Sequence, residues 1–238
     1  MKKIIKRKEL LQFGEEVTGY KGPVLNEREI RAAAGILFLV MFISLVFILF
    51  KQEFLLIKYV ILVFFTDFII RVLINPRFSP TLILGRLIVG GQIPEYVGAP
   101  QKKFAWTIGL VLSGLMFFLL VILNSYSIIT GFTCLVCLVF LFFETAFGIC
   151  LGCLLFRIFY KDETRHCAGE TCEQSKKHVV QKISGGQFLS LLSFTFLILL
   201  VSFFLNSYFR DKPKNLWQVI KGKEVANYFV LRQLQYPW

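Results

Sequence analysis

Long apolar blocks separated by short polar segments dominate the chain and predict membrane-spanning helices. A helix needs about 20 residues to cross a hydrocarbon core of about 30 Å. Apolar blocks of this length or longer lie at 31–50, 54–74, 104–124, 128–159 and 188–209. The fourth block is long enough for one tilted helix or for a helix broken near Gly148 and Gly152. We therefore predict an all-α integral membrane protein with a four-helix transmembrane core and a fifth C-terminal span.

The polar segments set the boundaries of the predicted domain organisation. Prolines and the short amphipathic stretch SPTLILGRLIVGG make 77–98 an interfacial or re-entrant helix rather than a span. The predicted parts are a basic cytoplasmic N-terminus at 1–28, the membrane core at 29–159, a hydrophilic loop with Cys and His at 160–186, an additional transmembrane helix at 187–209 and a basic aromatic tail at 210–238.

Composition and charge agree with a membrane protein and give it an orientation. Of the 238 residues, 56% are hydrophobic and 27 are Phe, which is far from the composition of soluble proteins. The net charge of +12 comes from Lys and Arg that collect in the N-terminus and in the loops 75–103 and 157–187, which predicts a cytoplasmic N-terminus. The cationic tail opposes this orientation if all five blocks span. Such charges contact lipid headgroups, so we predict the bilayer and no nucleic acid as a partner.

The stretch FFETAFGICLGCLLF places a Cys-x-x-Cys pair, Cys150 and Cys153, inside the fourth apolar block. One helical turn separates the two thiols, which allows a disulfide, and this spacing is typical of sites where thiol and disulfide interconvert. In a continuous helix the pair lies late, where the helix dipole opposes a thiolate and Arg157 would have to compensate. Cysteine is also a comfortable packing residue in apolar helices, so chemistry and packing are both open interpretations.

The remaining cysteines form two further pairs. Cys134 and Cys137 repeat the spacing, but about 24 Å of helix separates Cys134 from Cys150, which prevents direct exchange and favours packing. The hydrophilic loop combines two thiols with two imidazoles: Cys167, Cys172, His166 and His178. These loop residues are candidates for a zinc site, for a relay dithiol that exchanges with the membrane pair, or for an ordinary loop.

Two acids, Asp67 and Glu144, lie within apolar blocks, where ionisable residues are costly and often functional. Arg71 follows Asp67 by four residues and is its expected structural partner. Glu144 has no cation within one turn, so it must pair with another helix, face water or stay protonated. In a continuous helix Glu144 shares a face with Cys137 and not with Cys150, which favours a bundle anchor or a proton site over a base for Cys150.

Four motifs follow one another along residues 24–158: VLNEREIRAAAG, DFIIRV followed by SP, VGAPQKKFAWTIGL and FFETAFGICLGC. In this order they resemble a bacterial integral-membrane family known as a domain of unknown function. The residues that match the family pattern are Asp67 and Arg71; Pro100, Lys103, Phe104 and Ala105; and Glu144, Cys150, Gly152 and Cys153. It implies a four-helix core in the bacterial inner membrane, with a thioredoxin-like or sulfurtransferase protein as a candidate partner. Cys134 and Cys137 are not part of the pattern.

Three functional hypotheses follow. The leading one is thiol/disulfide or persulfide exchange at Cys150 and Cys153, with the loop cysteines as a relay. The second is a transporter or channel-like protein that uses Asp67 and Glu144. The third is a non-catalytic scaffold or assembly subunit that docks through the extra span and the tail. The sequence contains no nucleotide-binding glycine loop, no Ser/His/Asp spacing and no His-rich haem or copper motif, so we predict no cofactor.

Overall fold

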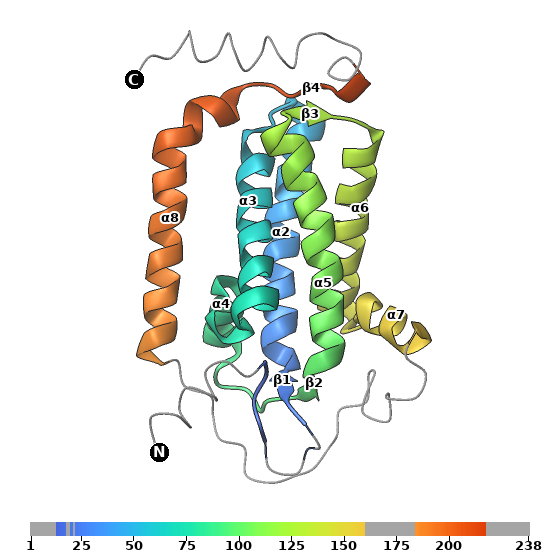
Figure 1. The fold of residues 1–238 in the computed structure, drawn as a ribbon, viewed down its shortest axis with the longest axis vertical. Helices are drawn as coiled ribbons and strands as arrows, with labels where there is room; N and C mark the ends of the chain where they lie inside the picture. The colour runs from blue at the N-terminus through green and yellow to red at the C-terminus, as the bar shows by residue number, and fades with distance from the viewer. Residues whose placement is uncertain (1–12, 18–19, 21, 160–183, 218–238) are drawn as a thin grey trace.

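The computed structural model describes residues 13–17, 20, 22–159 and 184–217, and helices make up most of this part (Figure 1). The helices are α2 (Glu27–Lys51), α3 (Leu55–Ile69), α4 (Pro80–Val89), α5 (Ala99–Met116), α6 (Ile128–Phe142), α7 (Leu151–Phe159) and α8 (Gly185–Arg210). Three of them continue into π-helical turns: Ile70–Ile74 after α3, Phe117–Ile122 after α5 and Phe143–Phe147 after α6. A 3-10 turn, Pro76–Phe78, precedes α4.

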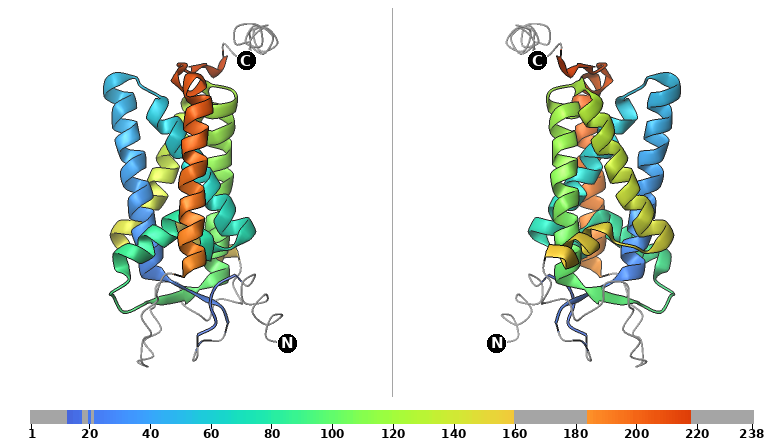
Figure 2. Two further views of the ribbon diagram at one scale, coloured as in Figure 1. Left: turned by 90° about the vertical axis from the view of Figure 1, so that its left-hand side faces the viewer. Right: turned by 90° about the vertical axis from the view of Figure 1, so that its right-hand side faces the viewer.

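The helices α2, α3, α5 and α6 stand side by side as a bundle (Figures 1 and 2). At one end, β1 (Val24–Asn26) pairs antiparallel with β2 (Tyr96–Gly98). At the opposite end, β3 (Ser125–Tyr126) pairs parallel with β4 (Lys214–Asn215). We call these the β1–β2 end and the β3–β4 end. Each end of the bundle therefore carries one small two-stranded sheet.

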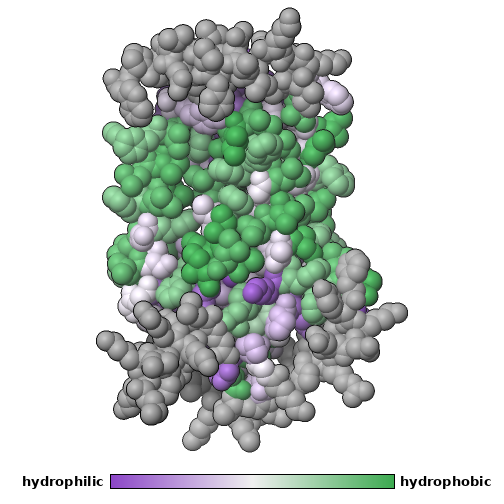
Figure 3. Space-filling view, in the orientation of Figure 1, coloured by the Kyte–Doolittle hydropathy of each residue, from purple (hydrophilic) through white to green (hydrophobic). Residues whose placement is uncertain are grey.

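The outer surface is that of a membrane protein. In the described part, four helical stretches are long and apolar enough to span a bilayer: α2, Ala99–Ile122, Ile128–Phe147 and α8. Together with its π-helical turn, α3 forms a further continuous helix over the predicted block 54–74. Apolar side chains form a broad band between the two polar ends (Figure 3), and Phe50 and Phe203 are 83% and 82% exposed. Such a surface requires lipid, so the predicted all-α integral membrane fold is confirmed.

The segment predicted to be interfacial or re-entrant contains α4. The Ser79 hydroxyl caps this helix by accepting a hydrogen bond from the backbone N–H of Leu82 at 3.3 Å, and Pro80 occupies the first helical position, where its missing N–H costs nothing. Thr81 and Ile83 are buried, and α4 packs against α2. This ten-residue helix therefore closes the β1–β2 end of the bundle without crossing it.

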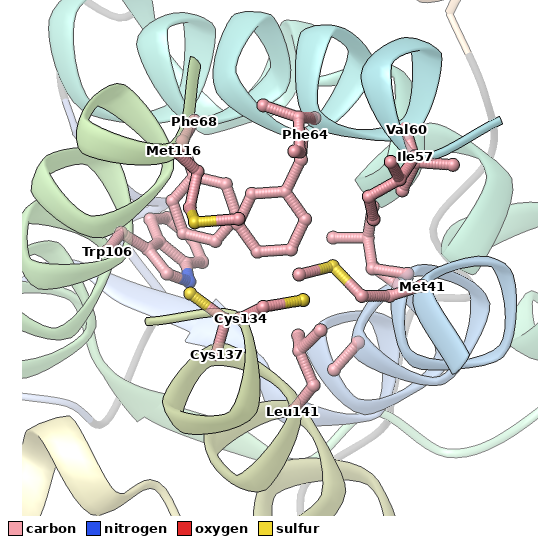
Figure 4. Packing of buried hydrophobic residues seen from close by; sticks show 14 of the residues in the cluster. Met41, Ile57, Val60, Phe64, Phe68, Trp106, Met116, Cys134, Cys137 and Leu141 are labelled. Atoms are coloured by element: carbon pink, nitrogen blue, oxygen red, sulfur yellow. The ribbon is translucent and has the colours of Figure 1, made fainter. Parts of the chain in front are cut away.

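The core lies between α2, α3, α5 and α6 and is built from aliphatic, aromatic and sulfur-containing side chains (Figure 4). Phe64 and Phe68 on α3 stack with their ring centroids 4.7 Å apart. Met41 and Met116 fill the space beside them, as unbranched and polarizable side chains do in irregular gaps. Cys134 and Cys137 belong to this same cluster.

The last helix, α8, is attached to the bundle mainly near its two ends. None of its most apolar window is buried. Near its first turn, the side-chain amide of Gln187 donates to the carbonyl of Arg77 at 3.1 Å and the hydroxyl of Ser190 donates to the carbonyl of Phe78 at 2.9 Å. Near its last turn, the hydroxyl of Tyr208 donates to the carbonyl of Val121 at 2.6 Å. Lipid is therefore the natural neighbour of its central turns.

Lys58 also holds this helix, which leads to a first prediction. Its buried ammonium donates to the Asn124 side chain at 2.6 Å and to the Asp211 carbonyl at 2.7 Å. Replacing Lys58 with methionine is expected to lower the free energy of unfolding by about 1–3 kcal/mol, because both acceptors lose a buried donor. Limited proteolysis at the C-terminal end of α8 should become faster. The same replacement of the exposed Lys51 is the control, and equal cleavage of both variants would contradict the prediction.

Candidate functional site

The chain turns sharply just before the Cys-x-x-Cys pair. After the π-helical turn Phe143–Phe147, Gly148 adopts a left-handed conformation with φ 67°, and α7 starts at Leu151. This position favours glycine because of its left-handed conformation, and a β-carbon there would also require the guanidinium of Arg31 to move. Of the two sequence interpretations of 128–159, the broken helix is therefore the correct one.

The break changes the electrostatic position of the thiols. Cys150 directly precedes the first residue of α7, and its Sγ accepts a hydrogen bond from the backbone N–H of Cys153 at 3.3 Å. The expectation that the pair lies late in a helix is wrong, because Gly148 ends one helix and a new one begins after Cys150. A helix N-terminus favours a thiolate rather than opposing it. Both thiols are free, with Cys150 half-buried and Cys153 buried.

The Cys150 thiol nevertheless holds its proton firmly. Cys150 lies in the turn between the helices and not in a spanning stretch. Its hydrogen bond with the Cys153 side chain and its removal from water raise the pKa of Cys150 well above the ordinary value, while the Lys102 ammonium opposes this rise. At neutral pH the Cys150 thiol is therefore protonated unless a neighbouring group removes its proton.

A buried charge cluster lies beside the thiols. The ammonium of Lys102, near the start of α5, is 2.5 Å from a Glu144 carboxylate oxygen and 2.8 Å from a Glu27 carboxylate oxygen. Lys102 is only 3% exposed and also interacts electrostatically with Cys150 and Cys153. Glu144 thus finds its cation on another helix, one of the three alternatives left open by its sequence. Arg157 is exposed on α7, and Lys102 is a buried cation close to both thiols.

The cluster continues towards the polar surface at the β1–β2 end. The Arg31 guanidinium lies 3.5 Å from a Glu27 carboxylate oxygen and 3.9 Å from a Glu95 carboxylate oxygen. Arg28 binds the same Glu95 at 2.6 Å. The Glu27 side chain is 4% exposed, whereas those of Arg31, Glu95 and Arg28 are 39%, 26% and 34% exposed. Ion pairs therefore connect the buried Lys102 with solvent-exposed groups.

Glu144 and Cys150 line one cavity of about 70 Å³. Its other walls are mainly apolar and come from α2, α3, α5 and α6. The expectation that Cys150 points away from Glu144 is wrong, because the break at Gly148 turns the chain back towards α5. Gly152 packs so closely against Ala105 of α5 that a β-carbon added at position 152 would lie 2.6 Å from the β-carbon of Ala105. The cavity is small and mainly apolar, and its charged or titratable lining residues are Arg71, Cys137, Glu144 and Cys150.

Asp67 and Arg71 form a saturated structural pair beside this cavity, which Arg71 also lines. Arg71 Nε lies 2.7 Å from an Asp67 carboxylate oxygen, and the two residues are 2% and 0% exposed, respectively. Asp67 also accepts hydrogen bonds from the hydroxyls of Ser79 and Thr81, both at 2.7 Å. The guanidinium lies 5.2 Å from the ring centroid of Trp106. The pair thus fixes the start of α4 against α3, the structural role expected for Arg71.

The other predicted site residues do not join this cluster. Cys134 and Cys137 are buried among aromatic and methionine side chains of the core, which is the packing environment expected for them (Figure 4). The loop residues with relay or zinc interpretations, Cys167, Cys172, His166 and His178, lie outside the described residues. Within the described ranges, no group of three His, Cys, Asp or Glu side chains is placed to hold a metal ion.

The sequence interpretation missed Lys102, Glu27 and Arg31. A usable signal for Lys102 is the period of the buried face of α5, which runs through Ala99, Lys102, Trp106, Ser113 and Met116. The adjacent Lys103, quoted for the family pattern, is exposed. Helical spacing therefore distinguishes the two lysines, whereas motif matching alone does not.

Comparison with known proteins identifies one family. A family model described as Domain of unknown function (DUF4395) matches residues 25–161, more than half of the chain. The match runs from β1 through α7 and includes both cysteines of the pair and the whole charge cluster. It confirms the predicted resemblance to an integral-membrane family described as a domain of unknown function. No curated protein and no solved structure matches the chain.

Proposed function

Since the chain belongs to the DUF4395 family, whose description assigns no activity, we propose from the geometry of its site that it exchanges thiols with disulfides or persulfides at Cys150 and Cys153. The observation that carries the proposal is the position of Cys150 at the start of α7, with its sulfur bonded to the Cys153 N–H and Lys102 nearby. A helix start and a cation are the two features that lower the cost of forming a thiolate.

The exchange proceeds in two displacements. The Cys150 thiolate attacks one sulfur of a substrate disulfide, so that a mixed disulfide forms and one substrate thiol leaves. The Cys153 thiol then attacks Cys150 Sγ, which closes the Cys150–Cys153 disulfide and releases the second substrate thiol. Two electrons pass from the cysteine pair to the substrate, and the two thiol protons end on the two released thiols.

The proposal places the pair near the cytoplasmic face of a bacterial inner membrane. Lys and Arg collect in the polar segments next to the β1–β2 end, and this bias favours the cytoplasm. The half-buried Cys150 lies towards this end, where a soluble protein can meet it. A thioredoxin-like or sulfurtransferase protein is the candidate partner.

Thiol trapping in lipid nanodiscs tests the proposal. The protein with Ser in place of Cys167 and Cys172 serves as the starting chain for the variants below. Incubated with a small aromatic disulfide, it is expected to release two equivalents of aromatic thiol and to close the Cys150–Cys153 disulfide. Cys153→Ser should stop at a stable mixed disulfide on Cys150, because the second displacement is lost. Cys150→Ser should fall to background. Cys134→Ser is the matched control in the core, and exchange that depends on Cys134 rather than Cys150 would refute the proposal.

The observed contacts favour thiol chemistry over the transport hypothesis. Asp67 accepts hydrogen bonds and an ion pair from Arg71, Ser79 and Thr81, so its carboxylate is already fully engaged in holding α4. A polar pathway would need such a group to face a solute instead. The tail on which the scaffold hypothesis depends lies largely at 218–238, outside the described residues.

A further inference from the structure

Exchange at the cysteine pair requires a place for a proton. A thiol attacks a disulfide only as the thiolate, and each leaving sulfur needs a proton afterwards. The hydrogen bond with Cys153 and burial keep Cys150 protonated at neutral pH. Lys102 stabilises a thiolate but, as an ammonium, cannot take the proton. Another group near the thiols must therefore act as the base.

Glu144 is the acid placed for this task. It is the one carboxylate among the described residues lining the cavity that also contains Cys150. Asp67 is saturated by Arg71, Ser79 and Thr81, and Glu27 lies on the far side of Lys102 between that residue and Arg31. The cavity of about 70 Å³ has room for a bridging water, which needs roughly 10–15 Å³. The charged and titratable groups that share the cavity with Glu144 are Arg71, Cys137 and Cys150. Lys102 and Glu27 face Glu144 from α5 and α2, Arg31 lies behind Glu27, and Cys153 lies near Lys102.

Building on the proposed thiol exchange, we propose that Glu144 accepts the proton of the attacking thiol and returns it to the leaving sulfur, and that Lys102, held by Glu27, is the positioning residue for Glu144. In the first displacement the Cys150 S–H bond breaks, its proton moves to the Glu144 carboxylate directly or through a cavity water, and the new sulfur–sulfur bond forms. The released substrate sulfur then takes this proton. The Cys153 thiol repeats the cycle in the second displacement, so the carboxylate ends as it began.

Lys102 keeps the carboxylate in place during this cycle. Its ammonium is 2.5 Å from Glu144 and is fixed from the other side by Glu27 at 2.8 Å. When Glu144 takes up a proton, the ammonium still faces the Glu27 carboxylate and the new thiolate, so the cavity keeps its charge balance. The ion pairs of Arg31 with Glu27 and Glu95 connect the cluster to the aqueous side.

The pH profile of exchange tests this role. The starting protein is a variant in which Cys134, Cys137, Cys167 and Cys172 are replaced by Ser, so that only Cys150 and Cys153 can react. Its rate of exchange with a small aromatic disulfide is measured from about pH 6 to about pH 10, the range in which thiols ionise. Glu144→Gln is expected to lower the rate at pH 7 by about 100-fold, as expected for loss of a general base. The loss should shrink as pH rises, because hydroxide then removes the proton, and Glu144→Asp should restore part of the rate.

Controls separate this inference from the proposed function. Glu53→Gln removes an exposed acid at the β3–β4 end and should keep the wild-type profile. If Glu144→Gln fails to fold, Glu144→Asp keeps the ion pair with Lys102 and should by itself show a smaller rate loss at pH 7 that also shrinks as pH rises. A profile of the folded Glu144 variant that overlays the wild type would overturn the role of Glu144 and leave the exchange function standing. A wild type that does not react would instead refute the exchange function.

Discussion

Replacing Arg71 with leucine is expected to lower the free energy of unfolding by about 3–5 kcal/mol, because Asp67 then stays buried without its cation. The variant also loses the contact of the guanidinium with Trp106 and its hydrogen bond to Ser79. The start of α4 depends on the Asp67 carboxylate, because it accepts hydrogen bonds from the hydroxyls of Ser79 and Thr81. Titration with SDS in mixed micelles, followed by tryptophan fluorescence, measures the loss.

A second variant shows whether the loss comes from the pair. In Asp67→Asn/Arg71→Leu the uncompensated charge is absent, so this protein should be more stable than Arg71→Leu alone, although less stable than the wild type. Arg77→Leu, which removes an exposed arginine six residues away, should change the unfolding free energy little. If the single and double variants were equally unstable, the buried charge would not be the cause.

Replacing Lys102 with methionine is expected to cost a similar amount, about 3–5 kcal/mol, for a different electrostatic reason. Lys102 stands between two carboxylates, and its removal leaves Glu27 and Glu144 as like charges without the cation that separates them. Adding Glu144→Gln should recover part of the stability, because one of the two charges is then gone. The same micelle titration provides the measurement.

The neighbouring lysine gives the matched control for this experiment. Lys103 is exposed and lies 5.1 Å from the ring centroid of Phe13, so Lys103→Met should change stability by less than about 1 kcal/mol. Equal losses at positions 102 and 103 would show that Lys102 does not hold a buried cluster. That result would contradict the proposed role of Lys102 in positioning Glu144.

The sequence was sufficient for the architecture because lipid imposes a simple length rule. Apolar blocks at 31–50, 54–74, 104–124 and 188–209 each coincide with a helical stretch in the structure. Helix ends depend on local capping and were predicted less well. For example, α2 starts at Glu27, ahead of the apolar block, because the Asn26 side chain accepts from the N–H of Arg28.

The site was predicted only in part because its residues meet through tertiary contacts. Cys150, Cys153 and Glu144 were visible as unusual residues in an apolar block, and the need of Glu144 for a partner was apparent. Their mutual orientation depends on the left-handed Gly148, which a continuous helical wheel cannot represent. Lys102 was hidden beside an adjacent lysine, and only the packing of α5 shows which of the two is buried.

The π-helical turn Phe143–Phe147 has a consequence for comparing members of the family. Such a turn holds one residue more than an α-helical turn, so in evolutionary terms it is equivalent to a single-residue insertion. A relative without that residue would rotate everything after the turn by about 100°. Its counterpart of Gly148 would leave Arg31, and its counterpart of Cys150 would leave the cavity. An ungapped alignment across 128–159 would therefore pair residues with different surroundings, and in a relative with a gap at 143–147 the counterpart of Cys150 is not expected to share a cavity with the counterpart of Glu144.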